Sequence, residues 1–386
     1  MVSNNITIVG AGPVGLVAGA LMAELNYSVN IIEANHKDFV LKDSKALALS
    51  NSTVFILKKL DIWKDLLKKA TYINEIHVSQ KNTFGRTLFE ANDYEEDALG
   101  YIVSYADLMK LLKNKIEGLQ NVHIFFNTKL ENVKNFKDSK NILIKNDGKE
   151  KELPFNLLVL ADGGKARIAG IDLTREEKDI NHIALVSSLK INKPHYGRAY
   201  ERFTKNGPIA LLPNTSNTFT LVWTGPKKYI DEIAKLNNDS LLKILQENFG
   251  KRAGEFVDIN EKSFFVLKSS ILKNISTPNV VAIGNASQII HPVAGQGLNI
   301  GMRDALELAK FVKTYFDDSF SKNISHDFNR IRKSQSKDII NITDQLSSIF
   351  LNNIIGFNNL RGLSLSALDA IPPLKRKFVR KMSYGA

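Results

Sequence analysis

Cysteine is absent from this sequence of 386 residues, which excludes disulfide bonds, thiolate catalysis and cysteine-ligated metals. The seven histidines are scattered and show neither HxxxH nor histidine–acid spacing, so we expect no metal site. No uninterrupted apolar run approaches the roughly 18 residues of a membrane-spanning helix. Internal repeats and low-complexity segments are also missing. These absences favour a cytoplasmic globular protein.

The composition is that of an ordinary globular protein, with 44% hydrophobic and 24% charged residues, and the length favours two domains. The formal net charge is +12, and the lysines are spread along the whole chain. Aromatic and basic residues do not interleave as a nucleic-acid-binding platform requires, so we expect no nucleic-acid partner. An anionic membrane surface is the better candidate partner for this charge.

The most informative motif is glycine-rich and lies near the N-terminus, Val-Gly-Ala-Gly-Pro-Val-Gly at 9–15. An apolar run at 6–9 precedes it, an alanine- and leucine-rich stretch at 16–25 follows it, and a second apolar run occupies 28–33. This order predicts a strand, a tight turn, a helix and a second strand, which is the start of a dinucleotide-binding fold.

The three glycines and the acid of that unit each have a physical role. Gly10 allows the turn, Gly12 lets the backbone approach a pyrophosphate, and Gly15 lets helix and strand pack closely. Glu33 closes the unit at the position where a carboxylate binds both ribose hydroxyls. The acid favours an unphosphorylated ribose, so the motif predicts FAD or NAD rather than NADP.

Two later apolar runs also end in polar or glycine-rich turns. The run at 155–163 ends in Asp-Gly at 162–163. The run at 279–284 continues into Gly-Asn-Ala-Ser-Gln-Ile-Ile-His-Pro-Val-Ala-Gly-Gln-Gly-Leu-Asn at 284–299, and a helix is predicted at about 298–315. Together with the first motif, these turns predict one extended cofactor that is bound at both ends.

Segments of a different character lie between these pieces. Residues 73–89 are typical of a strand hairpin, and 208–213 and 218–224 of two alternating strands joined by a polar turn. We therefore expect an α/β fold in which a sheet-rich substrate domain is inserted twice into a discontinuous cofactor domain. The predicted cofactor domain comprises 1–70, 95–180 and 275–335, the substrate domain 71–94 and 181–274, and a C-terminal helical segment 336–386.

The C-terminal segment is amphipathic and then basic. Apolar residues recur at helical spacing between 349 and 368, and five basic residues follow within 375–381. One interpretation is a peripheral segment that binds an anionic bilayer at the inner face of the membrane. The other is a helix packed on the core with a solvated basic tail, and the sequence leaves both open.

The three motifs, in this order and spacing, resemble the class A flavoprotein monooxygenases, which are aromatic hydroxylases similar to para-hydroxybenzoate hydroxylase. The segments 45–50, 197–213 with 221–223, and 284–304 are further similar to the ubiquinone-biosynthesis hydroxylases, especially the 2-polyprenyl-6-methoxyphenol hydroxylases. The resemblance covers essentially the whole chain. It implies an FAD-binding Rossmann-like domain with an inserted β-sheet substrate domain and C-terminal helices.

The resemblance also implies where FAD binds. Asn285 would bond the ribityl chain, and 292–299 would lie along the flavin ring, with the N-terminus of the following helix near its N1/O2 edge. The cofactor-binding residues implied in this way are Gly10, Ala11, Gly12, Pro13, Val14, Gly15, Glu33, Lys45, Asp162, Gly284, Asn285, Pro292, Gly295, Gln296, Gly297, Leu298 and Asn299.

For the reaction, the resemblance implies NAD(P)H as a transient reductant, O2 as co-substrate and a polyprenylated phenol as substrate. The chemically demanding steps take place on the cofactor, so no catalytic side chain is assigned. His291, Pro292 and Gln296 are the candidates, and His291 is better explained as a hydrogen-bonded structural histidine than as a proton-transfer group. The residues expected to give the substrate pocket its apolar surface are Ala210, Leu212, Leu221 and Trp223.

Three features depart from the family pattern. Lys45 stands where the family usually has arginine, Ala166 and Ala169 stand where serine and arginine usually follow the Asp-Gly pair, and Met109 stands where relatives often carry arginine. Several alternatives therefore stay open: an FAD-dependent hydroxylase of a soluble phenol, a flavin reductase or oxidase, and a weakly active FAD-bound scaffold in a quinone-synthesis complex.

Overall fold

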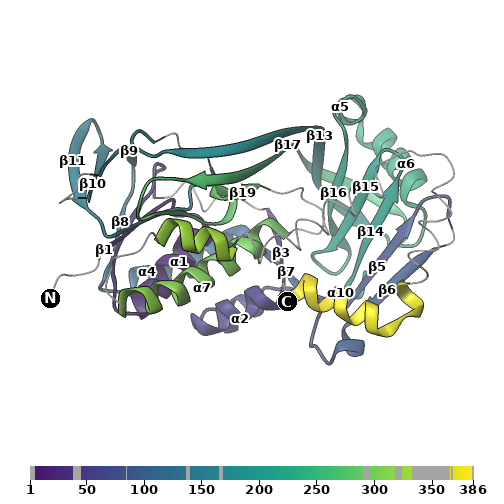
Figure 1. Cartoon of the computed structure of the whole chain (residues 1–386). Helices are drawn as coiled ribbons and strands as arrows, with labels where there is room; N and C mark the ends of the chain where they lie inside the picture. Colours follow the sequence, from purple (N-terminus) through teal and green to yellow (C-terminus); the bar gives the residue numbers. More distant parts are fainter. Residues whose placement is uncertain are drawn as a thin grey trace.

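The structure, a computed structural model, describes residues 5–37, 45–83, 85–135, 140–164, 168–289, 296–317, 324–332, 366 and 368–384. Figure 1 shows a parallel sheet with its helices at one end of the molecule and a larger sheet at the other. Two long strands, β13 (Leu173–Ile191) and β17 (Phe256–Ile275), pair with each other and run between the two ends (Figure 1).

Five short strands form the parallel sheet, in the order β18-β12-β1-β2-β8. They are β1 (Asn5–Val9), β2 (Ser28–Ile32), β8 (Val122–Phe125), β12 (Leu157–Leu160) and β18 (Val280–Ala282). All of them except β8 lie within the apolar runs that the sequence predicts as strands. Their side chains are mostly apolar on both faces because both faces of this sheet are covered.

Helices cover one face of the parallel sheet, and a small sheet covers the other. The helices are α1 (Pro13–Glu24), α2 (Asn51–Lys59), α3 (Trp63–Leu67), α4 (Tyr105–Glu117) and α7 (Gln296–Asp317), and they share one hydrophobic core with Ile6 and Ile8 of β1. The small sheet consists of β9 (Thr128–Asn135), β10 (Lys140–Asn146) and β11 (Lys149–Pro154), and it packs against Val9 and Leu160.

The larger sheet has eight strands, in the order β19-β17-β13-β16-β15-β14-β5-β6. Besides β13 and β17 these are β5 (Glu75–Gln80), β6 (Arg86–Glu90), β14 (Arg198–Thr204), β15 (Gly207–Pro213), β16 (Thr218–Pro226) and β19 (Gln288–Ile289). The predicted hairpins are present as the antiparallel pairs β5–β6 and β15–β16. The helices α5 (Lys227–Ala234) and α6 (Asn238–Phe249) pack on one face of this sheet.

The division into domains stays a prediction. The expected boundary between 180 and 181 falls inside β13, where the pairing with β17 shifts between Asp179 and His182. β13 therefore extends on both sides of the point where the substrate domain is expected to begin.

A third sheet and the C-terminal helix lie beside the eight-stranded sheet. The third sheet has the order β3-β7-β4, with β3 (Ala46–Leu49), β4 (Thr71–Ile73) and β7 (Gly100–Ser104), and the short helix η2 (Ala91–Tyr94) follows β6. Helix α10 (Pro372–Tyr384) lies beside β5 and β6 (Figure 1). Its Phe378 ring stacks on the Phe89 ring at 5.7 Å between centroids.

The basic residues of α10 do not all face solvent. The ammonium of Lys375 lies 3.2 Å from an Asp369 carboxylate oxygen and 3.8 Å from Asp93, and 5.7 Å from the centre of the Phe89 ring. Lys375 thus helps to pack α10 on β6. Most of the predicted amphipathic stretch between 349 and 368 lies outside the described residues. Within the described part of the chain, no helix is long and apolar enough to cross a membrane.

Candidate functional site

The carboxyl ends of four parallel strands lead into the predicted cofactor motifs, where Gly10 follows β1, Glu33 follows β2, Asp162 follows β12 and Gly284 follows β18. Val9 pairs with both Ile32 and Leu160, and Leu160 pairs with Ala282, so the four turns lie at one edge of the sheet. Ligands of open parallel sheets bind outside this edge.

The three glycines of the first motif meet different surroundings. Gly10 has φ +106° and a Cβ on it would lie 2.7 Å from the main-chain oxygen of Ala161, while a Cβ on Gly15 would lie 2.0 Å from the main-chain oxygen of Gly10. Both positions therefore need glycine for the protein's own packing. A Cβ on Gly12 would meet nothing within 4 Å. The space beside Gly12 is open, as a pyrophosphate-binding turn requires.

Gly12 is also the N-cap of α1, and no side chain caps this helix. Its first residue is proline, which has no N–H to satisfy. The remaining free N–H groups of the first turn and the helix dipole favour an anion here. The N-terminus of α1 therefore fits the phosphates of a dinucleotide.

Glu33 is buried and held rigidly next to this turn. One carboxylate oxygen accepts a hydrogen bond from the Ala11 N–H at 2.7 Å. The other accepts from the main-chain N–H of Asn35 at 2.9 Å and from its side-chain amide at 2.7 Å. A carboxylate has about four acceptor positions and three of them are used, so one remains for a ribose hydroxyl.

Asp162 and Asn285 lie in the neighbouring turns after β12 and β18, toward one end of this edge. A carboxylate oxygen of Asp162 accepts a hydrogen bond from the Gly164 N–H at 3.0 Å and so closes a tight turn. A Cβ on Gly164 would lie 3.1 Å from the main-chain oxygen of Asn285, so the turns after β12 and β18 pack together. The Asn285 side chain is exposed and borders the large cavity described below.

A buried carboxylate anchors the turn after β18, the short helix η3 (Gly284–Ala286). Asp304 of α7 accepts a hydrogen bond from the Gly284 N–H at 2.8 Å. The same Asp304 oxygen lies 2.9 Å from Nε of Arg332, and both side chains are almost fully buried. Burial raises the pKa of Asp304, although Arg332, the Gly284 N–H and Arg303 act against this rise.

Asn299 links the start of α7 to neighbouring elements. Its side-chain oxygen accepts hydrogen bonds from the Ser50 N–H at 2.9 Å and the Thr53 hydroxyl at 2.7 Å, and its amide donates to the Ala48 carbonyl at 2.9 Å. We assign this side chain to holding the first turn of α7 in place. A contact between Asn299 and a cofactor stays a prediction.

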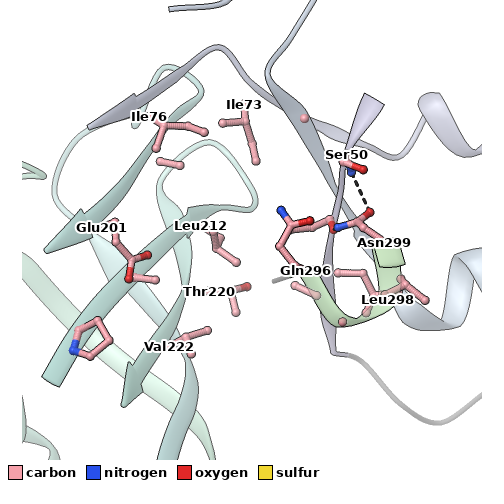
Figure 2. Close-up of a pocket in the computed structure, with 18 of the residues that line it drawn as sticks. Ser50, Ile73, Ile76, Glu201, Leu212, Thr220, Val222, Gln296, Leu298 and Asn299 are labelled. Carbon is pink, nitrogen blue, oxygen red and sulfur yellow. Dashed lines mark hydrogen bonds between the residues drawn. The ribbon is translucent and has the colours of Figure 1, made fainter. Parts of the chain in front are cut away.

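A cavity of about 580 Å³ lies between the start of α7 and the eight-stranded sheet. Figure 2 shows its two walls, with Gln296, Leu298 and Asn299 facing the strands that carry Leu212 and Thr220. Most of the described lining side chains are apolar. A mostly apolar cavity with a few polar groups beside a cofactor site is the usual form of a substrate pocket.

Two of the four predicted substrate residues line this cavity and two do not. Ala210 and Leu212 are part of its surface. The prediction for Leu221 and Trp223 is wrong, since both are fully buried in the core beneath α5 and α6. Side chains alternate between the two faces of a strand, so β16 instead presents Thr220, Val222 and Thr224 to the cavity.

The described lining of the cavity contains two charged residues, Lys45 and Glu201. The Lys45 ammonium lies 5.2 Å from the centre of the Phe265 ring, at the β17 side of the cavity. Glu201 of β14 lines the cavity on the sheet side (Figure 2). Glu201 was not among the predicted site residues. It alternates along β14 with Ala199 and Phe203, which also line the cavity, and this alternation is the sequence signal that points to it.

Several predicted site residues lie outside the described residues, so the structure gives no position for them. These are His291, Pro292, Gly295 and Ala166.

The comparisons with known proteins agree with this fold. The family model for the FAD binding domain matches residues 3–340. The uncharacterized protein slr1300 of Synechocystis sp. is 28% identical, with 98% of this chain and 92% of that protein covered. The 3-demethoxyubiquinol 3-hydroxylase of Escherichia coli is 23% identical, with 97% of each chain covered. Among solved structures, p-nitrophenol 4-monooxygenase PnpA of Pseudomonas putida has TM-score 0.79 at 13% identity, over 99% of this chain and 98% of that one.

The family model covers most of the chain, and the motifs it matches are those whose geometry fits a dinucleotide. The open turn at Gly12 and the fixed carboxylate of Glu33 lie at the same edge of the parallel sheet as the turn of Asn285, and Asn285 borders the apolar cavity. The chain therefore belongs to the FAD binding domain family, the class A flavoprotein monooxygenases.

Proposed function

We propose that this protein is an FAD-dependent hydroxylase that uses NAD(P)H and O2 to oxygenate the ring of a polyprenylated phenol in ubiquinone biosynthesis. The observation that carries the proposal is the large apolar cavity between the FAD motifs and the eight-stranded sheet. Relatives that align along nearly the whole chain are named ubiquinone biosynthesis monooxygenase COQ6, ubiquinone hydroxylase UbiL and 3-demethoxyubiquinol 3-hydroxylase, which supports the same substrate class.

The described residues fit FAD. The turn at Gly12 and the N-terminus of α1 would hold the pyrophosphate, Glu33 the adenosine ribose and Asn285 the ribityl chain. The first turn of α7, at Gln296 and Gly297, would place N–H donors and a positive helix end beside the flavin ring. When bound and reduced, FAD supplies the activation of O2 for transfer of one oxygen atom to an electron-rich ring.

The protein's own contribution is to position the ring and to exclude water. The apolar walls favour an uncharged aromatic ring with an apolar substituent, and each methylene that leaves water for such a surface contributes about 0.8 kcal/mol. A methylene of a tail that comes from a bilayer contributes much less free energy, because the tail is already in an apolar medium. Phe378 and Val379 of α10 complete one side of the cavity, so the C-terminal helix is part of the substrate site.

The function is tested by adding a short-chain prenylated phenol to the FAD-loaded protein with NADH or NADPH in air. We expect substrate-dependent oxidation of the reductant and one hydroxylated product for each reductant consumed. Reductant oxidation that yields only peroxide would identify a flavin oxidase or reductase. FAD that NAD(P)H does not reduce would identify a scaffold, and turnover of unprenylated phenols alone would identify a hydroxylase of soluble substrates.

We further propose that the outer surface of α10 binds an anionic membrane, from which the substrate enters. Ile371 and Leu374 are 47% and 48% exposed beside the exposed basic residues Arg376, Lys377 and Arg380. An apolar and basic surface of this kind is typical of peripheral binding, to which each basic residue contributes roughly 1 kcal/mol. This apolar and basic surface lies next to the cavity, because other side chains of α10 line the cavity.

Neutralising Arg376, Lys377 and Arg380 together should lower binding to anionic vesicles by about a hundredfold at low salt, and less at high salt. Vesicle sedimentation measures this, and FAD content should stay normal. Lys375 is left intact because it pairs with Asp369. The control neutralises Lys129, Lys145 and Lys149, which are exposed at the opposite end of the molecule (Figure 1). Equal binding by the α10 variant and this control would refute membrane docking through α10.

A further inference from the structure

Glu201 stands among apolar side chains on the cavity face of β14. Its register partners are Ala210 on β15 and Val78 on β5, and both line the cavity. Ala199 and Phe203, two residues away on the same strand, line it too. Among the described lining residues, Glu201 is the one acidic side chain.

The charged side chains that neighbour Glu201 on β14 and β5 lie on the face of the sheet opposite the cavity. Arg198 forms an ion pair with Glu75, which alternates on β5 with the cavity residues Ile76 and Val78. Arg202 donates hydrogen bonds to the Ser79 hydroxyl at 3.1 Å and the Asn248 carbonyl at 3.2 Å. These contacts are directed toward α6 and away from the cavity.

No described residue offers a partner to the Glu201 carboxyl group. On the cavity face, β5, β6, β13, β15, β16 and β17 contribute only uncharged side chains to the described lining. Of the remaining titratable lining residues, Lys45 lies over the Phe265 ring, and the Tyr200 hydroxyl approaches the Arg252 carbonyl. α10 contributes Phe378, Val379 and Ser383 to the lining. Burial alone raises the pKa of Glu201 to about 7.

Glu201 is half-buried, and its carboxyl group faces an apolar cavity in which no described side chain pairs with it. Such an unpaired ionisable group disfavours folding, so its presence in a cavity indicates that a ligand supplies the missing partner. The wall opposite Glu201 carries Gln296, at the start of the helix that we assign to the flavin (Figure 2). A ring held between these two walls would have one edge toward the flavin and a substituent toward Glu201.

We propose that Glu201 is a catalytic residue that binds the phenolic hydroxyl of the substrate and accepts its proton while the ring is oxygenated. This inference rests on the proposed function. It also assigns specificity to Glu201: the carboxylate favours a neutral phenol and disfavours a hydroxybenzoate, whose own carboxylate it would repel.

The proton balance of the step is simple. The phenolic O–H bond breaks, its proton forms a new O–H bond with the Glu201 carboxylate, and the electron pair stays on the phenolic oxygen. That electron pair raises the electron density of the ring carbons ortho and para to it, where oxygen is added. A free phenol has a pKa near 10, but it becomes more acidic as the ring gives electrons to the incoming oxygen, so a base of Glu201's strength can take the proton.

The decisive variant is Glu201→Gln, which keeps size and hydrogen-bonding capacity but cannot accept a proton. Glu131→Gln, at an exposed position on β9, is the matched control. Both proteins should retain FAD and its reduction by NAD(P)H. In single-turnover experiments, Glu201→Gln should hydroxylate about a hundredfold more slowly or worse.

The pH profile separates catalysis from mere positioning. The carboxylate form is the base, so wild-type kcat/KM should rise as pH increases through about 7 and then level off. This step should disappear in Glu201→Gln, while any other titrating group remains in both proteins. Wild-type rates and an unchanged profile in Glu201→Gln would overturn the assignment.

A binding measurement makes the test independent of turnover. Ligand binding to the oxidised, FAD-loaded protein is followed by the change in flavin absorbance, with a prenylated phenol, its methyl ether and the corresponding hydroxybenzoate. The wild type should prefer the phenol to both analogues by at least tenfold, and Glu201→Ala should lose this preference. If Glu201→Ala keeps it, the inference is refuted. If the preference is seen but no phenol is hydroxylated, Glu201 is a phenol-binding residue and the proposed function fails.

Discussion

We expect the Gly12→Val protein to fold and to be purified without FAD. Gly12 has φ −72° and ψ 175°, which valine adopts without strain, and a Cβ there would meet nothing within 4 Å. The protein itself therefore tolerates the side chain, apart from about 1 kcal/mol for a poorer N-cap. The added methyl groups would occupy the open space where the pyrophosphate must approach the backbone. The flavin-to-protein ratio and the far-UV circular dichroism spectrum measure the two effects separately.

Two further glycine variants serve as controls. Gly118→Val, at the end of α4, also has room for a Cβ, with its nearest contact at 3.5 Å, and should keep a full complement of FAD. Gly15→Ala should fail differently, because its Cβ would lie 2.0 Å from the Gly10 main-chain oxygen, and we expect misfolding. A folded Gly12→Val protein with normal FAD content would refute the assignment of this turn.

The FAD motifs could be predicted from the sequence because their information is local. Gly15 is required by its contact with Gly10 within one strand–turn–helix unit, and Glu33 follows directly after the next strand. Gly10 also meets the main chain of Ala161, which is distant in the sequence, but the glycine pattern itself is local. The same holds for the buried strands of the parallel sheet, whose continuous apolar runs are typical of strands covered on both faces. Spacing along the chain is sufficient to place such features.

The substrate wall could be predicted only in part because it depends on which face of a strand meets the cavity. The alternation of β16 shows that Leu221 and Trp223 share one face and Thr220 and Val222 the other. It does not show which face α5 and α6 cover. The larger apolar residues occupy the helix-covered core, and the smaller ones leave room for a ligand.

Glu201 was missed for a related reason. In the sequence Glu201 stands between Tyr200 and Arg202, and three consecutive polar side chains are typical of a strand that faces solvent. Only the assembled sheet turns both neighbours toward α6 and leaves Glu201 facing the cavity. Asn299 has a structural role that its motif did not reveal, since its side chain binds Ser50, Thr53 and Ala48, and its contact with a cofactor stays a prediction.

The buried pair of Asp304 and Arg332 should have a large effect on both stability and FAD binding. Asp304 also accepts the Gly284 N–H, so it joins α7 to the turn that carries Asn285. Burial is the dominant influence on its pKa, which is raised. The ion pair therefore offsets only part of the desolvation of the carboxylate, and removing one partner leaves the other charge buried and unpaired.

Asp304→Ala should accordingly destabilise the protein by about 3–5 kcal/mol, and lower the thermal midpoint by roughly 4–6 °C for a chain of this size. Differential scanning fluorimetry of the FAD-loaded protein measures the shift, and the flavin-to-protein ratio should fall because the Gly284 turn loses its anchor. The double variant Asp304→Leu with Arg332→Met removes both charges at similar volume, so it should recover most of the stability. It should not recover normal FAD content, since the Gly284 N–H still lacks its acceptor. A double variant as unstable as Asp304→Ala would show that the unpaired Arg332 charge is not the cause of the instability, and a single variant with an unchanged midpoint would refute the buried pair itself.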